Sequence, residues 1–228
     1  MVQIDFGQRE VAIKIVYYGP ALSGKTTNLQ QIHQRIDQRA RGRLMTLDTR
    51  DDRTLFFDLL PIAFRAQSGL KVKLKLYTVP GQVMHNSTRK IVLQGADGVA
   101  FVADSQVSET RANNEAYAGL RSNLREHGIE LREMPTVIQF NKRDLPHVRS
   151  EAEIGELARH GKEPLYLACA LRGDGVMATF FGLLKLTWDA LDRKFDFGGK
   201  FGVPREEFLG SMCRHLGVAP DELEGRVL

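Results

Sequence analysis

A short segment near the start of the chain has the residues of a phosphate-binding loop. Lys25 and Thr26 follow a glycine-containing turn in an unbroken match to the pattern G-x-x-x-x-G-K-[ST]. Glycines let backbone N–H groups curl around an anion, the Lys25 ammonium spans two phosphate groups, and the Thr26 hydroxyl is a ligand for Mg²⁺. A glycine turn before a capped helix would not need Lys25 and Thr26 together. The residues expected to contact nucleotide phosphates are Gly19, Ala21, Leu22, Ser23, Gly24, Lys25, Thr26 and Thr27.

A second polar motif predicts which base is bound. Asn141, Lys142 and Asp144 lie in a tetrapeptide that directly follows the apolar run 136–140. The Asp144 carboxylate can accept hydrogen bonds from the N1–H and the exocyclic amine of guanine, a donor pair that adenine lacks. We expect Asn141 to brace this loop and the Lys142 stem to lie over the base. A polar turn that caps a strand is the alternative for the tetrapeptide alone, but its place in a chain with a phosphate loop favours guanine.

Apolar runs alternate with segments of helical composition along the chain. The apolar runs are 11–18, 98–103, 136–140 and 164–168, and the helical segments are 25–39, 108–126, 150–160 and 176–191. This alternation predicts an α/β fold with a mainly parallel central sheet and helices on both faces. Ligands of such sheets bind beyond the carboxyl ends of the strands, where both polar motifs fall.

Residues 71–77 alternate lysine with apolar side chains, so Val72, Leu74 and Leu76 share one face. This pattern predicts a half-buried strand at an edge of the sheet. We interpret the lysine row as a solvated face, and a surface for an acidic partner is the alternative.

The composition is that of one globular domain with a short appendage. The chain has 228 residues, of which 43% are hydrophobic and 26% charged. Its net charge is +4, and the basic residues are scattered along the chain. Two cysteines exclude a disulfide framework and a four-thiolate zinc site. Neither a membrane-spanning run, a signal peptide nor a prenylation motif is present. We therefore expect a cytoplasmic protein, monomeric on its own, with no nucleic-acid partner and no lipid anchor.

The phosphate loop and the guanine motif together resemble those of the Ras-like small GTPases. The flanking runs 52–58, 78–82, 87–90 and 102–105 are similar to the bacterial MglA-type polarity GTPases, and the resemblance covers about residues 2–194. It implies a Ras-like P-loop GTPase that binds GTP or GDP with Mg²⁺ and switches between partners. It also implies slow hydrolysis of GTP, an activating partner of the roadblock fold (MglB-like), polarity or motility effectors, and concentration at a cell pole.

The resemblance also implies roles for single residues. Thr54 matches the switch threonine that holds Mg²⁺ and the γ-phosphate, as Thr26 does from the phosphate loop. Gly81 matches the glycine whose N–H contacts the γ-phosphate, and Gln82 the residue that orients the attacking water. Arg53 is similar to an arginine finger within the chain, so Arg53, Gln82 and Lys25 are the candidate catalytic residues. Cys169, Ala170 and Leu171 match the last base-recognition loop, where the Ala170 N–H would meet guanine O6.

Two positions depart from the common Ras-like pattern. Thr78 stands where most relatives have an aspartate that holds Mg²⁺ through water, and Asp48, Asp51 or Asp52 are candidate substitutes, unless water alone completes the Mg²⁺ shell. Ala21 replaces a glycine, and its methyl group either slows turnover or is tolerated. A GTP-bound scaffold with negligible hydrolysis is therefore one competing function. A P-loop kinase or ATPase is another, which Asp144 and the lack of an arginine-rich lid disfavour.

The C-terminal segment extends beyond the resemblance, so we divide the chain into a GTPase domain of residues 1–195 and an extension of residues 196–228. Glycines at 198, 199 and 202 before Pro204 predict a linker. Residues 205–216 then place Phe208, Leu209, Met212 and Leu216 on one face of a short helix. We expect this apolar face to pack on the main domain, and docking of a partner is the alternative.

We predict that Arg53→Ala leaves the affinity for GTP within a few-fold of the wild type. It should lower activated hydrolysis by about 10³- to 10⁵-fold, because an arginine finger neutralises charge only in the transition state. Phosphate release in single-turnover experiments, with and without a roadblock-fold partner, measures both effects. An unchanged activated rate would exclude Arg53 from the mechanism, and Gln82→Leu should trap the GTP form in the same assay.

Overall fold

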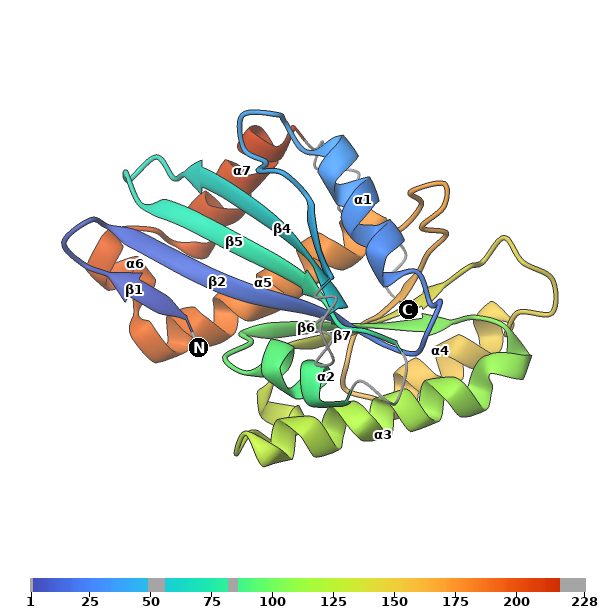
Figure 1. Ribbon diagram of the computed structural model, residues 1–228. Coiled ribbons are helices and arrows are strands. Elements are labelled where there is room, and N and C mark those ends of the chain that lie inside the picture. The colour runs from blue at the N-terminus through green and yellow to red at the C-terminus, as the bar shows by residue number, and fades with distance from the viewer. Residues whose placement is uncertain (1, 49–55, 82–85, 218–228) are drawn as a thin grey trace.

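The computed structural model describes residues 2–48, 56–81 and 86–217. Within them, an eight-stranded sheet has the strand order β3-β4-β5-β2-β6-β7-β8, with β1 beside β2 (Figure 1). The strands are β1 (Gln3–Asp5), β2 (Glu10–Tyr18), β3 (Met45–Asp48), β4 (Phe56–Arg65), β5 (Lys71–Thr78), β6 (Gly98–Asp104), β7 (Thr136–Asn141) and β8 (Leu165–Leu167). The helices are α1 (Lys25–Arg35), α2 (Asn86–Leu93), α3 (Thr110–Glu126), α4 (Glu151–His160), α5 (Val176–Phe195), α6 (Phe197–Phe201) and α7 (Arg205–Leu216). The predicted α/β fold is confirmed.

Parallel pairing of the central strands brings their carboxyl ends to one edge of the sheet. β2 pairs in parallel with β5 and β6, and β7 pairs in parallel with β6 and β8. Every residue of β6 is buried, as expected for a strand covered by helices on both faces. The pairs β1–β2, β3–β4 and β4–β5 are antiparallel. The loops that follow β2, β6 and β7 therefore start next to one another.

Helices cover both faces of the sheet, as predicted. The helices α1, α5, α6 and α7 lie on one face of the sheet, and α2, α3 and α4 lie on the other (Figure 1). Side chains of the first group join one buried apolar cluster, and side chains of the second group join another. α4 starts with a capping box, in which the Ser150 hydroxyl accepts the Glu153 N–H and the Glu153 carboxylate accepts the Ser150 N–H. No helix of the described residues is both long and apolar enough to cross a membrane.

The first helix is shorter than its composition predicts. The pattern extends to residue 39, whereas α1 ends at Arg35 because Ile36 has an extended backbone with ψ of 141°. The Asp37 carboxylate then accepts the Arg39 N–H at 2.8 Å, a local turn that competes with the helix. Arg41 next forms an antiparallel bridge with Ile62 of β4. Contact with another strand thus overrides the local helical preference.

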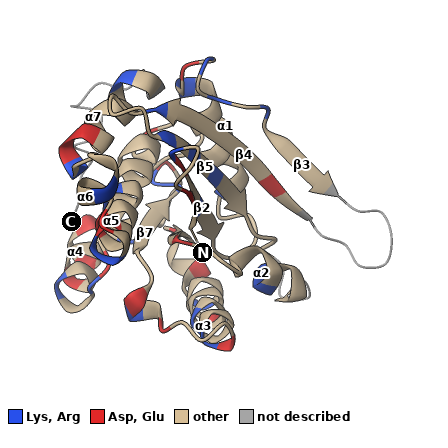
Figure 2. Ribbon diagram, turned by 90° about the vertical axis from the view of Figure 1, so that its left-hand side faces the viewer, with Lys and Arg blue, Asp and Glu red and all other residues tan. Residues whose placement is uncertain are grey.

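The edge position predicted for residues 71–77 is wrong, because β5 lies between β4 and β2. β3 and β4 form an antiparallel pair that extends the sheet beyond β5 (Figure 2). The sequence pattern did not predict β4, because Asp58 and Pro61 interrupt its apolar residues. The half-buried character of β5 is correct, and Lys73 forms an ion pair with Glu10 of β2 at 2.6 Å. Figure 2 shows basic and acidic positions interspersed along the helices and strands.

The glycine-containing segment predicted to be a linker is a short helix packed on the core. Phe197 and Phe201 of α6 are buried, and the Asp196 carboxylate caps the helix by accepting the Gly199 N–H. In α7, the ring of Phe208 stacks on Trp188 of α5, with centroids 3.8 Å apart. Within the described residues, the apolar face of α7 therefore packs on the domain, as the preferred alternative predicted.

We predict that Phe208→Ala lowers the free energy of unfolding by about 3–5 kcal/mol, since it leaves a cavity between α7, Trp188 and β4. Phe6→Ala is the control, because the Phe6 ring is 60% exposed and only stacks on Phe201. Chemical denaturation of both variants measures the difference. Equal, small losses would show that α7 contributes little to stability.

Candidate functional site

The glycine-containing loop connects the carboxyl end of β2 to the start of α1. Gly24 has φ of 96°, and a Cβ atom there would lie 2.2 Å from Nδ2 of Asn141, so the position requires glycine. α1 begins at the next residue, so Gly24 occupies the N-cap position. Among the described residues, the start of this helix has no side-chain cap. The first N–H groups of a helix lack partners within the helix and carry its positive dipole end. The loop therefore has the strand-to-helix setting of an anion site.

Lys25 is the buried cation of this loop, with 7% of its surface exposed. Its ammonium donates hydrogen bonds to the carbonyls of Pro20 at 2.5 Å and Gly19 at 3.2 Å. The pKa of Lys25 is lowered to about 7, mainly by burial and then by the charge of Arg89, while the charge of Asp58 partly opposes both effects. A bound anion would raise this pKa, because a nearby opposite charge favours the charged ammonium.

A carboxylate that the sequence analysis missed lies beside the loop. Asp58 of β4 is 1% exposed, and it accepts hydrogen bonds from three threonine hydroxyls. The distances are 2.6 Å from Thr26, 2.8 Å from Thr46 and 2.9 Å from Thr78. The Asp58 N–H also donates to the Thr78 hydroxyl at 2.9 Å. Thr26 and Thr78 thus meet at one buried carboxylate.

This arrangement changes the expectation about which carboxylate accompanies Thr78. Asp51 and Asp52 lie outside the described residues, and Asp48 ends β3. Asp58 is instead the carboxylate that contacts Thr26. A signal was present in the sequence, because an aspartate within an otherwise apolar stretch indicates a polar group with a specific partner.

Gly81 packs directly against the phosphate loop. A Cβ atom on Gly81 would lie 2.2 Å from Cα of Ala21, so glycine is required for this approach. Arg89 of α2 holds the segment by donating hydrogen bonds to the carbonyls of Pro80, at 2.9 Å, and of Gly81. The Arg89 guanidinium is buried and lies over the ring of Tyr18, 5.4 Å from its centroid. Arg89 therefore positions the Pro80–Gly81 segment, a role that its sequence context did not reveal.

Asn141 joins the guanine motif to both neighbouring loops. Its amide donates to the Ser23 carbonyl at 2.8 Å, and its side-chain oxygen accepts the Ala170 N–H at 2.8 Å. The resemblance implied that this N–H meets guanine O6, and the structure pairs it with Asn141. Lys142 forms an ion pair with Asp104 at the end of β6, 2.6 Å long. These contacts connect three loops at the carboxyl edge of the sheet.

Asp144 and Cys169 interact at the same edge. The Cys169 thiol donates a hydrogen bond to the Asp144 carboxylate at 3.1 Å, and this contact is the main cause that lowers the pKa of Asp144. Burial, followed by the bond to Asp144, raises the pKa of the Cys169 thiol. At neutral pH, Asp144 is therefore ionised and Cys169 is a protonated, buried side chain rather than a reactive thiolate.

A hollow of about 290 Å³ lies between these loops. It combines residues predicted to contact phosphate with residues predicted to contact the base. Its lining consists of Leu22, Gly24, Thr27, Asn141, Lys142, Asp144, Leu145, Ala170 and Leu171. Only Leu145 of this set was not predicted.

Comparison with known proteins identifies the family. No protein-family model matches the chain. The chain is 46% identical over 190 residues to the mutual gliding-motility protein MglA of Myxococcus xanthus strain DK1622. The aligned region covers 83% of this chain and 97% of that protein. This chain belongs to the MglA family. It is therefore a small GTPase with a Ras-like fold, which implies nucleotide binding.

Three predicted residues of this MglA-family chain have no described position. Arg53, Thr54 and Gln82 lie outside the described residues, so their assigned roles stay predictions. The described part of the site comprises the phosphate loop, Asp58, the Pro80–Gly81 segment and the base-recognition loops.

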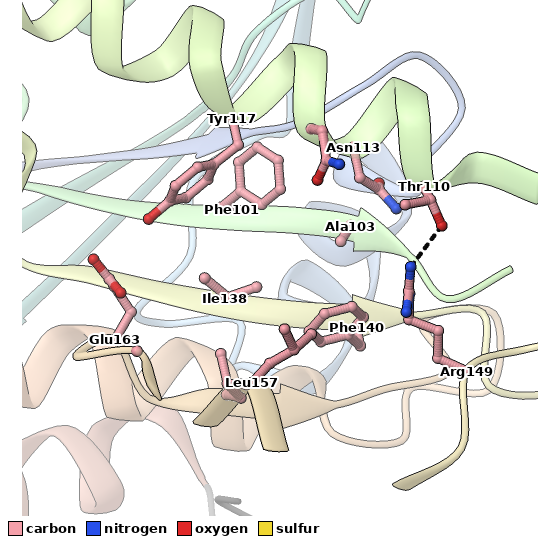
Figure 3. A pocket seen from close by; sticks show the side chains of 13 residues that line it. Phe101, Ala103, Thr110, Asn113, Tyr117, Ile138, Phe140, Arg149, Leu157 and Glu163 are labelled. Carbon is pink, nitrogen blue, oxygen red and sulfur yellow. Dashed lines mark hydrogen bonds between the residues drawn. The ribbon is translucent and has the colours of Figure 1, made fainter. Parts of the chain in front are cut away.

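A second hollow lies between α3 and α4, apart from the predicted site residues. It measures about 400 Å³, and its apolar lining includes Phe101 and Phe140. Figure 3 shows Tyr117 and Glu163 at one end and Arg149 at the other. Burial and the hydrogen bond with Glu163 raise the pKa of Tyr117 to about 12. None of the residues predicted to bind nucleotide lines this hollow.

Proposed function

We propose that this chain is a GTP-dependent switch that binds GTP and GDP in the hollow between its phosphate and base loops. It hydrolyses GTP slowly and controls cell polarity or gliding motility through partners that distinguish the two nucleotide states. The main support for this proposal is that residues of both motifs line one hollow. Leu22, Gly24 and Thr27 come from the phosphate loop, and Asn141, Lys142 and Asp144 come from the base motif. The Myxococcus relative is a gliding-motility protein, which supports the process that we propose.

The proposed base recognition rests on an ionised carboxylate at the rim of that hollow. Asp144 accepts the guanine N1–H and amine, and its lowered pKa keeps it an acceptor at neutral pH. Lys142, held by Asp104, covers the base with its stem, and Asn141 holds the loop to Ser23. A site that reads two donors discriminates strongly against a base that lacks them.

The residues beside Thr26 fit a magnesium ion. Mg²⁺ prefers oxygen ligands, and the Thr26 hydroxyl already contacts the Asp58 carboxylate at 2.6 Å. We assign Thr26 and Thr54 as the protein ligands, with Asp58 in place of the aspartate that Thr78 replaces. When bound, Mg²⁺ would neutralise charge on the β- and γ-phosphates. Asp58, Thr46 and Thr78 orient the Thr26 side chain through their shared hydrogen bonds.

The proposed hydrolysis depends on residues from three segments. Lys25 stabilises the phosphates, Gln82 orients water, and Arg53 neutralises the transition state. Arg89 holds Pro80 and Gly81 beside Ala21, and Gln82 follows directly in the chain. An activating partner of the roadblock fold would raise the rate by holding Arg53 and Gln82 in position.

We predict that Asp144→Asn weakens GTP binding by about 10- to 100-fold, because hydrogen bonds to a charged group are lost. Binding of xanthosine triphosphate should improve, since the new amide donates to the xanthine O2 where guanine has an amine. Asp174→Asn is the matched control, because Asp174 pairs with Arg172 in the neighbouring loop and does not line the hollow. Competition binding measures both nucleotides, and equal losses for the two would show that Asp144 does not read the base.

We also predict that Asp58→Asn raises the Mg²⁺ concentration needed to retain bound GDP by about 10- to 100-fold, the usual effect of losing a residue that orients a metal ligand. Asp97→Asn is the control, because Asp97 is a buried carboxylate that accepts the Lys14 N–H away from the site. Release of fluorescent GDP, titrated with Mg²⁺, makes the measurement. An unchanged Mg²⁺ requirement with GDP still bound would remove Asp58 from the metal site.

A further inference from the structure

Two buried amide side chains form a reciprocal hydrogen-bonded pair beneath the nucleotide hollow. Asn28 lies on α1 and Gln139 on β7, and both are fully buried. The Asn28 amide donates to Oε1 of Gln139 at 2.8 Å, and the Gln139 amide donates to Oδ1 of Asn28 at 3.0 Å. The pair therefore joins a helix to a strand that is distant from it in the sequence.

The same two amides extend the network to both nucleotide loops. The second N–H of Asn28 donates to the Gly24 carbonyl at 2.9 Å. The second N–H of Gln139 donates to the Thr179 hydroxyl at 2.9 Å, and this hydroxyl donates to the Gly175 carbonyl at 2.7 Å. Both N–H groups of each amide thus have an acceptor. The network is complete, which is the condition under which buried polar groups specify one arrangement.

Stability alone does not account for this network. A well-packed apolar pair of similar volume is often as stable as a buried hydrogen-bonded pair. Hydrogen bonds differ from apolar contacts in fixing distance and direction. The network starts at Gly24 in the phosphate loop and crosses β7 two residues before Asn141. It ends at Gly175, which follows the loop containing Cys169 and Ala170.

A second layer of hydrogen bonds runs parallel to the first. Asn141 joins Ser23 of the phosphate loop to Ala170 of the last base loop. This layer lies at the hollow, because Asn141 lines it, whereas Asn28 and Gln139 do not. Asn141 belongs to the guanine motif. Asn28 and Gln139 support the same loops from within the core.

We propose that Asn28, Gln139 and Thr179 are positioning residues that set the spacing between the phosphate loop and the base-recognition loops. The inference rests on the proposed function, since it assumes one guanine nucleotide that spans both. A ligand that bridges two sites gains affinity when their separation is fixed in advance. A ligand that touches only one of the sites does not. This difference separates positioning from general stabilisation.

The test uses three ligands and the double variant Asn28→Leu/Gln139→Leu, which replaces both amides with apolar side chains. Guanosine reaches the base loops, pyrophosphate reaches the phosphate loop, and GDP spans both. We expect the double variant to bind GDP about 10- to 100-fold more weakly, because the two loops are no longer held at the separation that GDP spans. Its affinities for guanosine and pyrophosphate should stay within about twofold. Calorimetric competition measures all three ligands, and thermal unfolding without nucleotide measures stability.

Thr179→Val provides a milder variant with a matched control. Thr187 is also buried in α5, and its hydroxyl also donates to the carbonyl four residues earlier, but it lies outside the network. Thr179→Val should weaken the binding of GDP but not of guanosine or pyrophosphate. Thr187→Val should leave the affinity for all three ligands unchanged, and Thr179→Ser should retain the wild-type affinity for GDP.

The outcomes separate this inference from the proposed function. Wild-type protein that fails to bind GDP contradicts the proposed function itself. Wild-type binding together with unchanged GDP affinity in Thr179→Val and the double variant overturns the positioning role. Equal losses for GDP, guanosine and pyrophosphate would reduce the network to a structural one and also overturn it. If the double variant does not fold, Thr179→Val with its control decides the question alone.

Discussion

Parallel pairing of β2, β6 and β7 is the constraint on which the rest of this structure depends. Because these strands are neighbours and run in one direction, the loops after each of them begin at the same edge of the sheet. Asn141 can therefore reach Ser23 and Ala170 with a single side chain. A strand order that moved β7 away from β2 would separate the phosphate loop from the base motif, whatever their residues.

Buried positive charge near the phosphate loop exceeds the buried negative charge described there. Lys25 and Arg89 are both buried near the phosphate loop, and Asp58 is the carboxylate that offsets them in the described residues. Burial lowers the pKa of Lys25 because water no longer stabilises its charge. This arrangement supports the proposed nucleotide site, because a phosphate group would supply the opposite charge.

The C-terminal helices reinforce the half of the sheet that carries Asp58. Phe208 of α7 packs on Phe64 of β4 and stacks on Trp188 of α5. The Ser68 N–H donates to Glu207 at 3.0 Å, which ties α7 to the turn between β4 and β5. β4 is an outer strand with only the short β3 beyond it, so helix packing supplies support that pairing cannot. The extension therefore packs on the strand that carries Asp58.

Local patterns in the sequence determined the alternating strands and helices, the phosphate loop and the guanine motif. These features can be predicted because their geometry depends on residues close together in the chain. Such residues are glycines at turns, apolar residues at regular spacing, and a lysine followed by a hydroxyl residue at the start of a helix. The prediction placed the end of α1 too late, because the following residues contact a distant strand. It missed β4, because Asp58 and Pro61 interrupt the apolar pattern of that strand.

Only the tertiary structure decided which distant polar groups meet. Asp58 contacts Thr26 across 32 positions of sequence, and Asn28 contacts Gln139 across 111. Nothing in the spacing of such residues specifies a partner, because a buried amide or carboxylate can pair with any donor that the fold brings within about 3 Å. The sequence therefore determined the motifs that we predict to contact the ligand, whereas the hydrogen bonds that hold those motifs at one separation depend on strand order and helix placement.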